Sequence, residues 1–115
     1  MKLRNSKTEH DLRVELKRSQ LALLNAPDKA RLLEAVLKSA PDSVSPFVLN
    51  WIPGQGEDVY VILADQNCVL TIELDRVNVE EEAVVSKTDV RTYESGLGKH
   101  ARLKLAIAKS LTSKP

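Results

Sequence analysis

The loop at residues 96–99, Gly-Leu-Gly-Lys, is the segment of this chain that comes nearest to a phosphate-binding motif. A loop of the G-x-x-x-x-G-K-[ST] type wraps successive backbone N–H groups around the phosphates and places a hydroxyl on Mg²⁺. Here the glycines are spaced G-x-G, and the residue after Lys99 is His100. The sequence therefore does not predict a nucleotide site, although the amides that begin the following helix could hold an anion.

Side chains that could ligate a metal or attack a substrate are scattered along the chain. His10 and His100 are far apart in sequence, and the single Cys68 lies in an apolar run with no histidine nearby to form a thiolate. The acidic run at residues 80–82, like Glu73 before it, is typical of a solvated turn or strand face. No G-x-S-x-G elbow occurs. We expect no catalytic residue, no metal and no cofactor, and we predict that the protein is not an enzyme.

The only tryptophan stands at the start of a glycine-containing segment, residues 51–58. Glycines allow another backbone to approach closely, and a tryptophan beside a loop is a common anchor of a binding hot spot. We predict a partner-binding loop formed by Trp51, Gly54, Gly56 and Asp58. The alternative is that Trp51 is simply the largest core anchor in a chain with only four aromatic side chains.

A basic helix is predicted near the end of the chain. Residues 95–115 hold five basic side chains and no acidic one. On a helical wheel Leu103 and Ile107 lie in the main apolar stripe, and the bases lie on two flanks with a second apolar patch around Leu105 between them. A helix that enters the major groove of DNA would gather its bases on one side, so a packed helix with solvated flanks is favoured. We predict that the helix packs against another helix or a partner through a basic and apolar surface formed by Lys99, Arg102, Leu105 and Lys109.

The net charge of +1 hides an uneven distribution along the chain. Counting Lys and Arg against Asp and Glu, residues 1–56 carry +3, residues 57–94 carry −7 and residues 95–115 carry +5. The favoured interpretation is an acidic sheet that is complemented by basic helices within one fold. The alternative is two surfaces that serve two partners.

The overall composition indicates an ordinary globular domain. A chain of 115 residues with 43% hydrophobic and 29% charged residues can form one core. No apolar run is long enough to span a membrane, and one cysteine cannot form an internal disulfide. We expect a cytoplasmic protein that does not bind membranes.

Two helices are predicted before the first strand, at residues 8–25 and 27–40. The leucines of the first helix fall on more than one side, so this helix contacts two surfaces or bends. Pro27 suits the first turn of the second helix, whose apolar residues form one stripe. That stripe contains Leu32, Leu33, Val36, Leu37 and Ala40.

Short apolar runs separated by turn residues then predict a sheet. Residues 47–52 lie between two prolines, as in an edge strand, whereas residues 59–64 are apolar on both faces, as in a central strand. Residues 68–75 alternate, and residues 83–86 and 90–93 predict one or two further strands. The hairpin-length connections favour a single α+β domain with an N-terminal helix pair, an antiparallel sheet of three to five strands and a C-terminal helix packed on the sheet.

The predicted function follows from these features. We expect residues 1–7 and 112–115 to be disordered tails of the one domain, residues 1–115. The chain is interpreted as a small protein-binding or regulatory domain, and its partner is another protein or a second copy of itself. The alternative is a nucleic-acid-binding protein that uses the basic segments at its two ends, residues 2–7 and 99–114.

Overall fold

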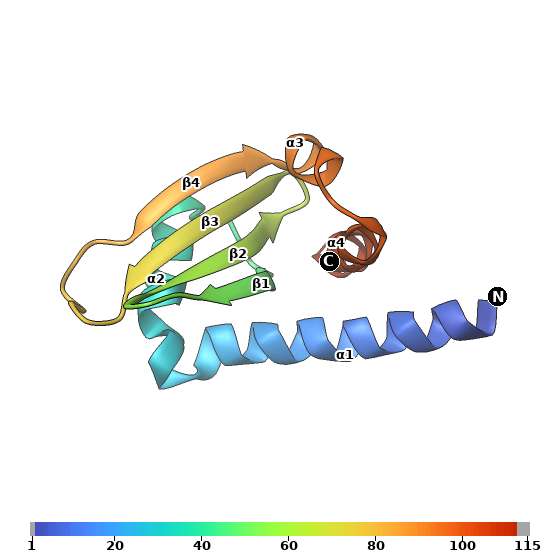
Figure 1. The fold of residues 1–115 in the computed structure, drawn as a ribbon, viewed down its shortest axis with the longest axis horizontal. Coiled ribbons are helices and arrows are strands. Elements are labelled where there is room, and N and C mark those ends of the chain that lie inside the picture. The colour runs from blue at the N-terminus through green and yellow to red at the C-terminus, as the bar shows by residue number, and fades with distance from the viewer. Residues whose placement is uncertain (1, 113–115) are drawn as a thin grey trace.

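A four-stranded sheet organises the molecule, and its strands follow one another in the chain (Figure 1). A computed structural model of the chain describes the backbone of residues 2–112 and the side chains of residues 8–112. All neighbouring strands are antiparallel, in the order β1-β2-β3-β4. This confirms the predicted antiparallel sheet, with the first strand at an edge and the second in a central position. The strands are β1 (Phe47–Pro53), β2 (Glu57–Asp65), β3 (Cys68–Asp75) and β4 (Val84–Asp89).

Helical segments precede and follow the sheet in the chain. The N-terminal helix pair and the C-terminal helix packed on the sheet are both present, so the predicted α+β class is confirmed. No helix in the described part of the chain is long and apolar enough to cross a membrane. The segments are α1 (Lys2–Asn25), the short 3-10 helix η1 (Pro27–Lys29), α2 (Ala30–Ser39), α3 (Val90–Ser95) and α4 (Lys99–Thr112).

The helix α3 replaces a strand that the sequence predicted at residues 90–93. The carboxylate of Asp89 accepts hydrogen bonds from the backbone N–H and the hydroxyl of Thr92, at 2.9 and 3.0 Å. These bonds make Asp89 the N-cap of α3 and turn the chain out of the sheet directly after β4. The N-cap at Asp89 therefore outweighs the strand preference of the β-branched residues in 90–93.

The segments expected to be tails largely belong to helices. Residues 2–7 form the first turns of α1, and Thr112 is the last residue of α4. The hydroxyl of Thr112 donates a hydrogen bond to the carbonyl oxygen of Ser45 at 3.2 Å. Met1 and residues 113–115 lie outside the described residues.

The two faces of the sheet carry two separate cores. On one face α2 buries Leu32, Ala35 and Val36 against apolar side chains of the central strands, including Ile62 and Ile72. Leu37, which the sequence placed in this stripe, is 42% exposed because α2 turns it away from the sheet. On the other face α1 and α4 pack on the ends of the strands, where the core contains Leu12, Leu16, Phe47, Leu63, Val69, Leu105 and Ile107.

The position of α1 explains why its leucines fall on more than one side. Figure 1 shows α1 running beside β1, the edge strand, and continuing past the end of the sheet. Leu12 and Leu16 therefore belong to the core beneath α4, whereas Leu23 belongs to the core beneath α2. A helix that borders a sheet edge contributes to the cores on both faces.

Candidate functional site

Trp51 lies on β1 with its indole ring half exposed and held in place. The ring stacks on Tyr60 of the neighbouring strand, with a centroid distance of 6.3 Å and an interplanar angle of 10°. The Nζ atom of Lys29 lies 6.0 Å from the centroid of the indole and 5.6 Å from that of the phenol. Because Trp51 remains 54% exposed, it is not the core anchor that the sequence left as an alternative. One stacked aromatic ring and one cation fix the orientation of this exposed side chain.

The predicted loop after Trp51 is a tight turn closed by an arginine. The backbone N–H of Gly54 donates to the carbonyl oxygen of Glu57 at 2.7 Å, and Gly56 has φ +90°, which favours glycine. Arg76 lies at the end of β3 and holds this turn: its backbone N–H donates to the carbonyl oxygen of Gly56 at 2.8 Å, and its guanidinium donates to the carbonyl oxygen of Gly54.

The carboxylate of Asp58 is part of this closure. It is 3.1 Å from the Arg76 guanidinium, and the residue is only 8% exposed. The structure thus brings Gly54, Gly56 and Asp58 together around Arg76, while Trp51 alone of the predicted loop residues offers a large exposed side chain. Asp58 has a structural role in this arrangement, which we call the Arg76 clamp.

The sheet face opposite α2 is covered over only part of its length. The helices α1 and α4 pack at the end near Phe47, and Figure 1 shows no helix in front of the other end. A row of paired residues crosses all four strands there: Ile52, Val59, Glu73 and Val84. Ile52 is 50% exposed and Val84 is 59% exposed.

Exposed apolar side chains gather at this end of the sheet, which we call the distal surface. Among the described residues, half of the exposed large hydrophobic side chains belong to it. Trp51 and Ile52 point to opposite faces of the edge strand β1, so the surface wraps around that edge. The distal surface comprises Trp51, Ile52, Val77, Val79 and Val84.

The four residues predicted to form a basic and apolar surface on α4 do not share one surface. Leu105 is 1% exposed and packs in the core beneath α1, so it cannot contribute to a surface. Lys99 and Arg102 are exposed, and Lys109 is half-buried beside the β2–β3 turn and the start of α3. The guanidinium Nε of Arg102 donates to the carbonyl oxygen of Leu97 at 3.1 Å. The basic residues therefore stand on solvated flanks of a packed helix.

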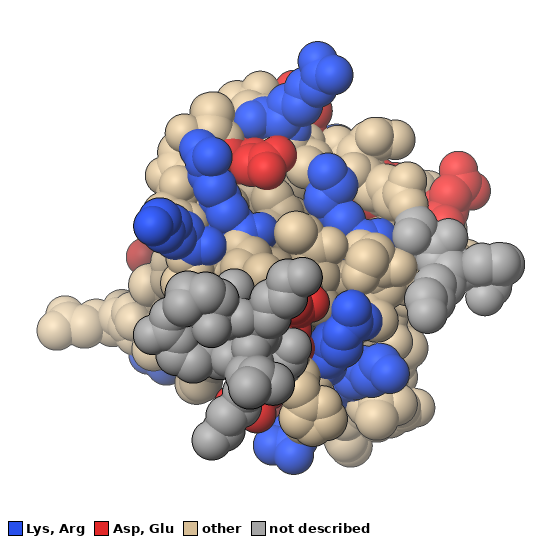
Figure 2. Space-filling model, turned by 90° about the vertical axis from the view of Figure 1, so that its right-hand side faces the viewer, with Lys and Arg blue, Asp and Glu red and all other residues tan. Residues whose placement is uncertain are grey.

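In the described part of the chain, the structure shows no ion pair of the kind that the favoured interpretation of the charge distribution predicts for α4. Among the described residues no ion pair joins α4 to a strand of the sheet. Lys104 of α4 pairs instead with Glu15 of α1, at 2.5 Å. Figure 2 shows Lys and Arg side chains spread over the described part of the end formed by α1 and α4, with acidic side chains between them. The acidic β3–β4 loop lies at the distal end, away from α4.

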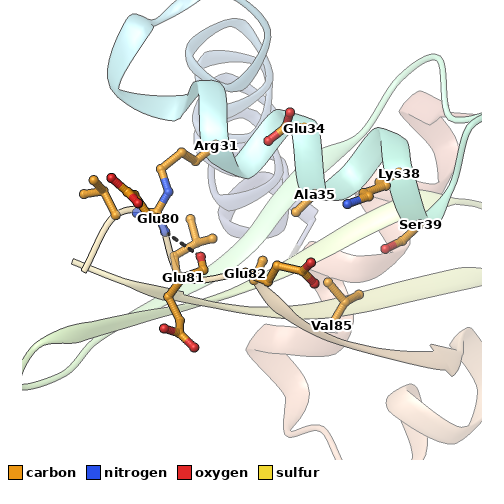
Figure 3. A pocket seen from close by; sticks show the side chains of 12 residues that line it. Arg31, Glu34, Ala35, Lys38, Ser39, Glu80, Glu81, Glu82 and Val85 are labelled. Carbon is orange, nitrogen blue, oxygen red and sulfur yellow. Dashed lines mark hydrogen bonds between the residues drawn. The ribbon is translucent and has the colours of Figure 1, made fainter. Parts of the chain in front are cut away.

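A groove of about 470 Å³ separates α2 from the β3–β4 loop (Figure 3). Arg31 of α2 crosses its mouth and donates to the carbonyl oxygens of Asp75 and Glu81, at 2.9 and 3.4 Å. Leu74, Ala83 and Val85 also line it. The charged residues Glu34, Lys38, Glu80, Glu81 and Glu82 belong to its lining as well. Arg31 thereby fixes the acidic loop to α2.

Among the described residues, the titratable side chains with a shifted pKa are Cys68, Asp89 and Tyr93. Burial raises the pKa of the half-buried Cys68 thiol, Asp65 raises it further, and Lys87 acts in the opposite direction. No group of three or more His, Cys, Asp and Glu side chains that could hold a metal occurs among the described residues. Cys68 is therefore a protonated thiol near neutral pH.

Sequence reasoning missed several residues of the distal surface. Ile52 and Val84 were assigned to strands, but their exposure depends on where α4 stops covering the sheet, and no local pattern encodes that. Arg76 stands directly after the alternating residues 68–75 and was assigned no role from the sequence. A lone base after an acidic strand, preceded by a glycine turn, is the signal that could have identified the clamp.

Comparison of the chain with protein-family models, curated proteins and solved structures found no match.

Proposed function

We propose that this protein is a small non-enzymatic domain that binds another protein through the distal surface, with Trp51 as the anchor. The observation that carries the proposal is the half-exposed indole of Trp51, held by Tyr60 and Lys29. Tryptophan is enriched at binding hot spots because one ring brings a large apolar area. A ring that is already oriented loses less side-chain entropy when a partner covers it.

The surroundings of Trp51 favour a partner of particular chemistry. The Arg76 clamp fixes the adjacent turn, so the backbone beside the indole is also ordered before binding. The acidic loop at residues 80–82 lies at the same end of the sheet. A partner with an apolar patch bordered by basic side chains would complement this end. The single, half-buried cysteine is compatible with a reducing cytoplasmic setting.

Affinity capture with matched variants tests the proposal. We expect Trp51→Ala to weaken binding of the captured partner about thirtyfold, because hot-spot truncations typically cost about 2 kcal/mol or more. Val44→Ala is the control, since Val44 is an exposed apolar residue in the α2–β1 connection. Circular dichroism of both variants verifies the fold. Trp51 is the only tryptophan, so its fluorescence reports binding of the purified partner directly.

Two outcomes would count against the distal surface. If Trp51→Ala binds the partner as the wild type does, Trp51 is not the anchor. If Val44→Ala weakens binding equally, the effect is not specific to the distal surface. An unchanged indole emission spectrum on addition of saturating partner would also contradict contact with the ring.

Nucleic-acid binding is the second candidate, and one observation favours it. The helices α1 and α4, which carry the basic terminal segments, pack together at one end of the molecule (Figure 1). Lys99 and Arg102 are exposed there and form no ion pair with a described residue. The side chains of the predicted basic residues Lys2, Arg4 and Lys7 lie outside the described side chains.

Titration of short duplex and single-stranded oligonucleotides at several salt concentrations tests this candidate. Binding through phosphates would weaken with rising salt, because cationic side chains release condensed counterions. We then expect the double variant Lys99→Glu, Arg102→Glu to bind at least about tenfold more weakly and to show a shallower salt slope. Lys38→Glu, on α2 at the other end, is the control. Absence of binding at low salt would exclude the candidate.

A further inference from the structure

The two edges of the sheet differ in how their backbone groups are satisfied. Along β1, the N–H of Val48 donates to Ser19 Oγ at 3.3 Å, and the N–H of Trp51 donates to Asn50 Oδ1 at 2.9 Å. The side-chain amide of Gln20 donates to the carbonyl oxygen of Pro46 at 3.2 Å. Side chains therefore occupy two N–H groups of β1 and the carbonyl oxygen just before it, and α1 lies beside this edge. These contacts obstruct the addition of a second strand here.

The backbone of β4 presents its outward groups without such partners. The N–H of Val90 donates to the carbonyl oxygen of Asn67 at 3.1 Å, at the end of the β3–β4 pairing. Because every second residue of an antiparallel strand bonds to its neighbour, this bond shows which residues of β4 bond to β3. Even-numbered residues of β4 point their N–H and C=O groups toward β3, so those of Val85 and Lys87 point outward. No described residue donates to or accepts from these outward groups. Figure 1 shows no element lying along this edge.

We infer that β4 pairs with β4 of a second copy of the chain, antiparallel, with Ser86 opposite Ser86. A two-fold axis perpendicular to the sheet keeps each face of one sheet continuous with the same face of the other. Near the middle of β4 the axis can pass between the two copies of Ser86 or between the two copies of Lys87. Pairing at Lys87 would place two lysines directly opposite each other, which destabilises a sheet. Pairing at Ser86 places Val85 opposite Lys87 twice, and the backbone groups of both residues point outward. Four backbone hydrogen bonds then join two four-stranded sheets into one of eight strands.

The side chains along β4 fit the same register. Val84 comes to lie opposite Thr88 of the second copy on the same face of the sheet, a pair of β-branched residues that stabilises sheets. Lys87, a residue type that often protects edges, lies opposite Val85, where its methylene groups can cover the valine.

Sedimentation equilibrium over a range of protein concentrations tests the pairing. We expect a mass twice the 12.8 kDa of the chain at high concentration. Lys87→Pro removes an outward N–H of each copy and leaves the groups that bond to β3 unchanged, so the dissociation constant should rise about tenfold or more. Lys87→Thr, which keeps the backbone donor, is the control and should remain dimeric. A wild-type protein that stays monomeric at every concentration overturns the inference.

A cysteine at the axis gives a readout that does not depend on the folding of a proline variant. In a non-hydrogen-bonded antiparallel pair the two Cα atoms are about 4.5 Å apart, within the range for a disulfide. Ser86→Cys should therefore form a covalent dimer on mild oxidation. Lys87→Cys, displaced from the axis, should form much less, as should wild-type protein with its half-buried Cys68. Equal cross-linking at both positions would overturn the register.

A dimer unaffected by Lys87→Pro and by oxidation of Ser86→Cys would use another surface and would refute the β4 pairing. This inference does not depend on the proposed function, because β4 pairing and Trp51 binding have separate variants.

Discussion

Asp89 shows how one side chain decides the path of the chain between the sheet and the C-terminal helices. Hydrogen bonds from the backbone N–H and then from the hydroxyl of Thr92 hold the pKa of the Asp89 carboxyl below its ordinary value, and Arg91 acts in the same direction. Folding thus favours the ionised form. The contribution of Asp89 to stability is present above the unfolded pKa, about 3.9, and is lost as the pH falls through the lower folded pKa.

Replacement of this cap should have a pH-dependent effect. We expect Asp89→Ala to lower the melting temperature by a few degrees at neutral pH, because α3 loses its N-cap. The difference from the wild type should shrink at acid pH, where the wild-type carboxylate is protonated and no longer stabilises the fold. Thermal melts from neutral to about pH 3 measure it, with Asp42→Ala, an exposed acid outside these contacts, as the control. A difference that stays constant over this range would contradict the assignment.

Trp51 and Asp58 show how much of the site the sequence could predict. Both were singled out by residue type and by the glycines near them. The contacts that separate their roles come from β2, η1 and the end of β3, which are distant in sequence. The exposed anchor could therefore be named in advance, whereas the assignment of Asp58 to the Arg76 clamp required the fold.

The helix α4 carries the core of one sheet face, and Leu105 is its central residue. We expect Leu105→Ala to lower the free energy of unfolding by about 2–5 kcal/mol, because it leaves a cavity between α4, α1 and the sheet. Urea denaturation measures this change. Leu103→Ala is the control at a half-buried position on the same helix and should cost less. A smaller loss for Leu105→Ala than for Leu103→Ala would place the buried face of α4 elsewhere.

Most helices and strands could be predicted because their patterns are local. Alternation identified β3, apolar residues on both parities identified β2, and Pro27 marked the boundary that η1 occupies. The orientation of α4 could not be predicted, because apolar side chains lie on two of its sides. Contact with both α1 and the sheet selected the side that contains Leu105, and a helical wheel carries no information about such neighbours.

The whole molecule is elongated, with principal extents of 48 × 29 × 28 Å, and its ends differ in charge. The basic side chains of α4 lie at one end, and the acidic β3–β4 loop lies at the other (Figures 1 and 2). Composition predicted this segregation along the sequence. It could not predict that the fold would keep the charged segments apart in space, since this depends on where the helices pack.

Separated charges give the single chain an electric dipole along its length. A dipolar protein turns in the field of a charged partner, so a monomer would meet such a partner with one end first and at a rate that falls as salt is added. A two-fold axis perpendicular to the sheet reverses every vector that lies in the sheet plane. Pairing at β4 would therefore cancel the dipole, and self-association would convert a protein whose encounters are oriented by charge into one whose encounters are not.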